Sequence, residues 1–162
     1  MPMPERVSWV IAAMVAIAGC DTVPVPPPPA PETIRYATSP CSGTCPVYTV
    51  TVSSDGVGLF EGTRFTAVTG PRHFTLTPAQ FADFRARLAA VRPVGERLLQ
   101  PPNCNGRVAP DLSGVDLRWM SVARNDRLAV NYGCDRATNA ALFDLLRAAP
   151  LALPISTFIG TR

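Results

Sequence analysis

Five cysteines are the residues of this chain whose type and spacing could carry chemistry. They occur in 162 residues, as Cys20, Cys41, Cys45, Cys104 and Cys134. A thiolate can act as a nucleophile or as a metal ligand, whereas in an oxidising compartment two cysteines form a disulfide. The compartment and the neighbouring residues therefore decide which chemistry applies.

A redox or copper site is one use of the closely spaced pair, Cys41 and Cys45. Their C-x-x-x-C-P motif resembles the copper site of Sco-type copper chaperones, in which the motif leads into a helix whose N-terminus lowers a thiol pKa. Here Cys45-Pro46 leads into residues 47–53, which alternate like a strand. His73 is the only histidine and lies far along the chain. Thiol redox or copper handling is therefore our alternative interpretation.

Other catalytic arrangements are not apparent. A nucleophilic triad needs a base, and His73 is the only histidine, but the sequence has no G-x-S-x-G motif. A hydrolase whose activity depends on His73 is therefore only our third interpretation. No acidic pair has the spacing typical of glycosidase or metal sites. We expect the carboxylates at turns or strand flanks, namely Asp55, Asp111, Asp116, Asp126 and Asp135. The sequence predicts no enzyme activity, no metal and no cofactor.

The N-terminus indicates export and lipidation. Residues 7–18 are apolar except for Ser8, which is too short for a bilayer-spanning helix and typical of a signal peptide. The following Ile17-Ala18-Gly19-Cys20 resembles the bacterial lipobox, which implies cleavage after residues 1–19 and acyl chains on Cys20. We expect a lipid-anchored envelope protein that faces the periplasm. Asp21 resembles an inner-membrane retention signal, and the choice between inner and outer membrane stays open.

A Pro-rich tether should separate the lipid from the folded part. Residues 20–33 favour polyproline II, which makes a semi-rigid stalk or, as a sharper alternative, a ligand for a Pro-binding groove. We assign residues 34–150 to one domain and residues 151–162 to a C-terminal tail. The net charge of +3 comes with arginines scattered along the chain, so we expect no nucleic-acid binding.

Two units of hairpin followed by helix are predicted within the domain. In the first, residues 48–53 and 57–61 flank the turn Asp55-Gly56, and short strands follow at residues 65–68 and 73–76. Thr77-Pro78-Ala79-Gln80 then has the pattern of a helix start with a capping box.

The second unit repeats this order. Strands are predicted around Leu117 and Val130, with the turn at Asn125-Asp126 and a helix capped by Asp135 or Thr138. Residues 94–114 should form a long loop that contains Cys104. The fold class is therefore α+β, an antiparallel sheet with helices on one face and disulfide staples.

Four cysteines remain after lipidation of Cys20, and they allow three pairings. We favour Cys41–Cys45, which closes a tight turn through Gly43, and Cys104–Cys134, which ties the long loop to the second hairpin. Chain-entropy arguments give stabilisation of roughly 2 kcal/mol for the short loop and nearly 4 kcal/mol for the long one.

Residues 39–48 read S-P-C-S-G-T-C-P-V-Y, and Asp55-Gly56 follows after a strand. This stretch resembles a bacterial domain family of unknown function with the signature S-x-C-x-G-x-C-P-x-Y, over roughly residues 33–150. The resemblance implies a structural role for Cys41, Gly43, Cys45, Pro46 and Tyr48, and members that are often exported or lipidated. It brings no activity. We expect a non-enzymatic binding or structural module whose partner is an envelope protein or a small ligand, with the bare sheet face as one surface for it.

Overall fold

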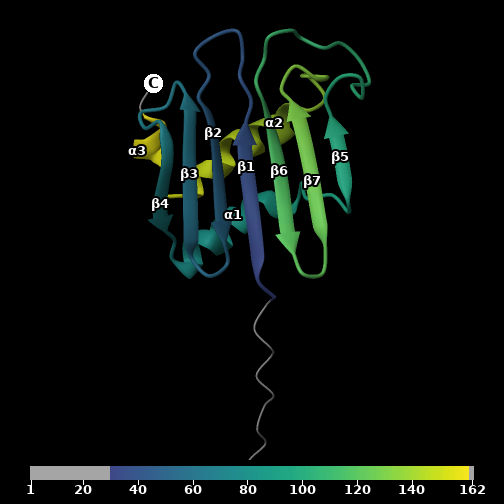
Figure 1. The fold of residues 1–162 in the computed structure, drawn as a ribbon. Coiled ribbons are helices and arrows are strands. Elements are labelled where there is room, and N and C mark those ends of the chain that lie inside the picture. The colour runs from purple at the N-terminus through teal and green to yellow at the C-terminus, as the bar shows by residue number, and fades with distance from the viewer. Residues whose placement is uncertain (1–29, 161–162) are drawn as a thin grey trace, which may run out of the picture.

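A seven-stranded sheet dominates the fold of residues 30–160, which are the residues described by the computed structural model (Figure 1). The predicted signal peptide, Cys20 and most of the predicted tether lie outside these residues. The strands are β1 (Glu32–Thr38), β2 (Val47–Ser53), β3 (Val57–Arg64), β4 (Gly70–Thr75), β5 (Glu96–Leu99), β6 (Gly114–Ser121) and β7 (Asn125–Asn131). The helices are α1 (Pro78–Ala89), α2 (Ala140–Ala148), the 3-10 helix η1 (Ala149–Ala152) and α3 (Ser156–Ile159). None of the described helices is long and apolar enough to cross a bilayer.

The sheet is mixed, with the strand order β4-β3-β2-β1-β6-β7-β5. All neighbours are antiparallel except β5, which runs parallel to β7 at the edge. The expectation of a purely antiparallel sheet is therefore wrong at this edge, because residues 94–114 were expected to form only a loop. With four residues, β5 is too short to show a clear alternation of apolar and polar side chains.

The central strand β1 was not predicted. It begins at Glu32, within the expected tether, and pairs with β2 on one side and β6 on the other. Ile34 and Tyr36 point into the core, whereas Thr33 and Arg35 are half-buried on the other face. The preceding prolines obscured this alternation of apolar and polar residues.

The first helix confirms its predicted start. The side chain of Thr77 accepts a hydrogen bond from the Gln80 amide at 3.2 Å, and the Gln80 side chain accepts one from the Thr77 amide at 2.9 Å. Gly56 has a φ of 90°, as the predicted turn between β2 and β3 requires. In Figure 1 the helices α1 and α2 lie behind the sheet. Their buried side chains belong to the single hydrophobic core, with Phe81, Phe84 and Leu88 from α1 and Phe143 and Leu146 from α2.

Three local predictions are wrong. Residues 65–68 form a loop rather than a strand, because their amides at Ala67 and Val68 bond to carbonyls of α3. The turn between β6 and β7 lies at residues 122–124, so that Asn125 and Asp126 belong to β7. The α2 helix is preceded by Asn139, which makes no side-chain cap, and not by Asp135 or Thr138.

The residues assigned to a C-terminal tail are folded as far as residue 160. Leu153 and Ile155 are 5% and 0% exposed, and Phe158 packs against Phe60 and Phe74 with ring centroids 5.5 and 6.2 Å away. The α-helix α2 ends at Ala148, and the 3-10 helix η1, which contains Pro150, follows it directly. The side chains of Leu153, Ile155 and Phe158 bury apolar surface against the core, and this burial holds the segment in place.

A buried carboxylate secures the end of the sheet at which β1 begins. Asp126 is 3% exposed and accepts hydrogen bonds from Arg92 at 2.6 Å and from the Gly95 amide at 2.9 Å, and it pairs with Arg124 at 2.7 Å. Arg92 also reaches Glu32 at 2.5 Å. The hydrogen bond from Arg124, together with those from Arg92 and Gly95, holds the pKa of Asp126 well below its usual range.

We predict that Asp126→Asn lowers the free energy of unfolding by about 2–3 kcal/mol at pH 7, because it leaves Arg124 without its charge partner and Arg92 with Glu32 as its remaining one. The lowered pKa means that this stabilisation is present above about pH 4 and is lost as the pH falls below it. Urea titration at pH 7 and pH 2 measures the difference. The exposed Asp144→Asn is the matched control, and an equal effect of Asp126→Asn at both pH values would contradict the assignment.

Candidate functional site

A pocket of about 410 Å³ opens at the end of the sheet opposite Glu32. The four central strands contribute one wall, through residues at the end of β1, before β2, at the start of β6 and after β7. These residues are Tyr36, Thr38, Cys45, Pro46, Tyr48, Ser113, Gly114 and Tyr132. The C-terminal part of the chain closes the other side with Arg147, Pro150, Leu151, Leu153, Ile155, Ser156 and Ile159.

The predicted motif builds part of the strand wall. The Thr38 hydroxyl donates to the Pro46 carbonyl at 2.9 Å and accepts from the Tyr48 amide at 2.9 Å, which fixes β1 against the entry to β2. The Tyr48 ring stacks between Tyr36 and Phe60, with centroids 6.3 and 5.4 Å away. The motif therefore shapes the pocket as well as the chain turn before it.

Gly43 has no conformational reason to be glycine in this structure. It does not have a positive φ, and a Cβ atom added there would meet only the sulfur of Cys41, at 3.8 Å. Its amide donates to that sulfur at 3.3 Å. The tight turn around Gly43 is present, but its backbone conformation and the space around it would also accept residues other than glycine.

Two tyrosines place neutral hydroxyls at the pocket. Tyr36 is 2% exposed and donates to the Leu146 carbonyl at 3.0 Å. Burial raises the pKa of Tyr36 well above its usual value, and the neighbouring Tyr132 and Tyr48 add to the shift. Burial likewise raises the pKa of Tyr132. Both hydroxyls therefore remain protonated at neutral pH.

Among residues 30–160, Arg147 is the one charged residue that lines the pocket. Its guanidinium lies over the Tyr132 ring at 4.3 Å and near the Phe143 ring at 6.0 Å, in cation–π geometry. Its ion pair with Asp144 at 3.3 Å is on the surface, with 52% and 78% of the two side chains exposed. A surface pair of this kind is weak, so it leaves Arg147 able to bind another anion.

The Cys41–Cys45 disulfide lies at the pocket rim. It joins the favoured partners, with Cα atoms 5.8 Å apart, and both cysteines are partly buried. The Ser42 amide, between the two cysteines, donates to the Asp111 carbonyl, and the Ser39 amide, before them, donates to the Gly114 carbonyl at the start of β6. The bond thus closes the loop that carries the pocket wall.

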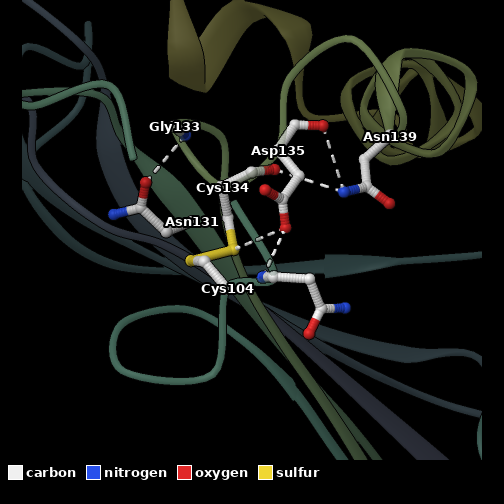
Figure 2. Close-up of a disulfide and its surroundings, with 7 residues drawn as sticks. Cys104, Asn131, Gly133, Cys134, Asp135 and Asn139 are labelled. Atoms are coloured by element: carbon white, nitrogen blue, oxygen red, sulfur yellow. Dashed lines mark hydrogen bonds between the residues drawn. A yellow bond between two sulfur atoms is a disulfide. The ribbon is translucent and has the colours of Figure 1, made fainter. Parts of the chain in front are cut away.

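Figure 2 shows the second disulfide, Cys104–Cys134, whose Cα atoms are 5.4 Å apart. Cys134 is fully buried, and the neighbouring Asp135 accepts a hydrogen bond from the Asn105 amide at 2.7 Å. The Asn139 side chain donates to the carbonyls of Cys134 and Asp135 at 3.2 Å each. The disulfide therefore attaches the loop after β5 to the turn that leads into α2.

The remaining candidate residues are not brought together. His73 is exposed on the edge strand β4, and no group of three or more His, Cys, Asp and Glu side chains in residues 30–160 could hold a metal ion. Asp55 lies in the predicted turn, whereas Asp116 and Asp126 lie within strands.

The sheet face opposite the core is polar. Arg127 joins Asp116 and Glu96 there, at 2.5 and 2.9 Å, and Arg118 also pairs with Asp116. This ion-pair network makes the part of the face over β6, β7 and β5 polar, unlike the apolar patches that mark binding sites. The pocket at the end of the sheet is the better candidate.

Comparison with known families identifies the class of domain. A family model described as Domain of unknown function (DUF6438) matches residues 32–149. This range contains the strand wall of the pocket and Arg147, whereas the segment from Pro150 to Ile159 lies beyond it. Among curated proteins and solved structures, none matches the chain.

We predict that the two disulfides differ in their contribution to stability. Replacing Cys104 and Cys134 together by alanine should lower the free energy of unfolding by nearly 4 kcal/mol, against about 2 kcal/mol for Cys41 and Cys45, since the closed loops differ in length. Urea titration of the two double variants under non-reducing conditions provides the comparison. A larger loss for the Cys41 and Cys45 variant would be inconsistent with this assignment.

Proposed function

We propose that this chain, which belongs to the family described as Domain of unknown function (DUF6438), is a lipid-anchored module of the bacterial cell envelope. In this proposal Cys20 carries the lipid, and the domain binds a small ligand without reacting with it. The observation that carries the binding role is the aromatic pocket with Arg147 in its lining, to which Cys45, Pro46 and Tyr48 and the C-terminal segment contribute.

Export is supported by cysteine chemistry. The four cysteines of the domain form two disulfides, and such bonds persist in oxidising compartments such as the periplasm. The apolar segment of residues 7–18 and the lipobox-like residues 17–20 give the same compartment from an independent part of the sequence. Both the disulfides and the N-terminal residues therefore support an extracytoplasmic protein.

Ligand binding is supported by the shape and lining of the pocket. Its volume lies in the range of small-molecule sites, and its walls combine aromatic and aliphatic side chains with a few polar groups. Those polar groups come from β1, β2, α2 and α3 and from the residues directly before β6 and after β7, which are separate in the sequence. A small molecule held between them would contact both the family-matched part and the C-terminal segment.

The strand topology also bears on where the pocket would lie relative to a membrane anchor. The chain enters the fold at Glu32, at one end of β1, and the pocket lies beyond Thr38, at its other end (Figure 1). In a lipid-anchored protein the pocket would thus open away from the bilayer that holds Cys20, toward ligands in the surrounding space.

A second candidate function is disulfide exchange by Cys41 and Cys45. The observation in its favour is that Cys45 lines the pocket and both cysteines are only partly buried, whereas Cys134 is fully buried. Titration of thiols after equilibration with graded glutathione buffers distinguishes the two functions. A reduction potential of the Cys41–Cys45 bond in the range of known exchange proteins, about −120 to −270 mV, would favour exchange. A potential below about −300 mV would favour a structural role.

We predict that Cys20→Ser abolishes lipidation, because the thiol that would carry the acyl chains is lost, and the chain then lacks both their mass and the anchoring that depends on them. Fractionation of cells followed by intact-mass analysis measures both location and lipid mass. Cys41→Ser is the matched control and should stay in the membrane fraction. An unlipidated, uncleaved chain with four free thiols would contradict both export and anchoring.

A further inference from the structure

We infer that the ligand of the pocket is an organic anion with an apolar body, such as a carboxylate on an aromatic or aliphatic group. This inference rests on the proposed ligand-binding function and names the chemical class of the ligand. The geometry points to Arg147 as the group that binds the anion and to the C-terminal segment as the contact for the apolar body.

The charge of the pocket selects the sign of the ligand. Within the described part of the chain, Arg147 is the one charged side chain of the lining, which contains no Asp or Glu. A cation would be repelled there, whereas a carboxylate would gain a charge-assisted hydrogen bond from the guanidinium. Stacking on Tyr132 at 4.3 Å holds the guanidinium in place, so that little side-chain freedom remains to be lost on binding.

The hydroxyl groups are suited to the same ligand. Tyr132 stays protonated at neutral pH, since burial raises its pKa, and a protonated hydroxyl is a donor, whereas the Tyr36 hydroxyl already donates to the Leu146 carbonyl. Ser113 and Ser156 line opposite sides of the pocket and add two more hydroxyls. An anion can accept hydrogen bonds from the hydroxyls of Tyr132, Ser113 and Ser156, while the charge of Arg147 sets the preference for its sign.

The apolar side of the pocket requires an apolar body on the ligand. Leu151 lines the pocket beside buried Leu153 and Ile155 and is 77% exposed, so its side chain offers apolar surface to a ligand. A ligand that covers Leu151 would remove apolar surface from water, and this gain grows with the area buried. Since these residues lie beyond residue 149, the body of the ligand would be recognised by a part of the chain outside the family match.

The test uses three probes with the same body and different heads: 4-phenylbutyrate, 4-phenylbutanol and 4-phenylbutylamine. The protein is the exported Cys20→Ser chain with both disulfides intact, and dissociation constants are measured by NMR titration. We expect the carboxylate to bind at least about 10-fold more tightly than the alcohol, and the amine to bind most weakly.

Variants assign the two ends of the ligand. Arg147→Gln should weaken phenylbutyrate binding about 10-fold and leave phenylbutanol binding unchanged, whereas the exposed Arg85→Gln should alter neither. Leu151→Ser should weaken both. Because Arg147 and Leu151 are exposed, these variants should fold, which the thermal unfolding midpoint checks.

Two outcomes would overturn different claims. Equal affinity for the carboxylate and the alcohol, or equal loss of both in Arg147→Gln, would overturn the anion preference and leave the pocket as a ligand site. Failure of all three probes to bind at millimolar concentration would overturn the binding role itself, together with the inference built on it.

Discussion

The backbone hydrogen bonds on both sides of β1 hold this molecule together. One side joins β1 to the β2–β3–β4 meander and the other joins it to β6, and through β6 to β7 and β5. Without β1, the two halves of the sheet would have no shared strand. Its Ile34 and Tyr36 side chains also enter the core from the centre of the sheet.

The same strand separates the two functional ends of the protein. At its start, Glu32 binds Arg92 and through it the buried Asp126, which secures the point where the chain from the predicted lipid anchor enters the fold. At its end, Thr38 bonds to the entry of β2 and lines the pocket. The proposed attachment and the proposed ligand site would therefore lie at opposite ends of one strand.

Prediction from sequence worked where a local pattern decides the structure. The capping box at Thr77 and Gln80, the turn at Gly56 and the strands β2, β6 and β7 depend on neighbouring residues, and the structure contains them. It failed where long-range contacts decide. The β1 strand follows prolines, β5 is held only by its parallel partner, and the segment after Pro150 folds because Ile155 and Phe158 find the core.

Sequence reasoning found only part of the candidate site for the same reason. The motif residues Cys45, Pro46 and Tyr48 were singled out, but for a structural role. Tyr36, Tyr132 and Arg147 were missed, because strand order alone makes them neighbours. The available signals were the position of Tyr36 two residues after Ile34 and that of Arg147 one helical turn after Phe143, on the face that meets Tyr132.

The motif and the two disulfides all hold residues of the pocket wall in place. The Cys41–Cys45 bond closes the loop before Pro46, and the Cys104–Cys134 bond fixes the turn between Tyr132 and the helix that carries Arg147. A domain of this size gains rigidity from such staples, and a rigid pocket binds with a smaller loss of conformational freedom.

The most direct test of this account is the location of bound phenylbutyrate, mapped by its effect on the backbone amide signals of isotope-labelled protein with both disulfides formed. The account predicts that the signals that change belong to Gly114, Tyr132, Arg147 and Ser156, around the pocket. Changes confined to the ion-paired sheet face around Arg127, or to the end of the sheet at Asp126, would contradict it.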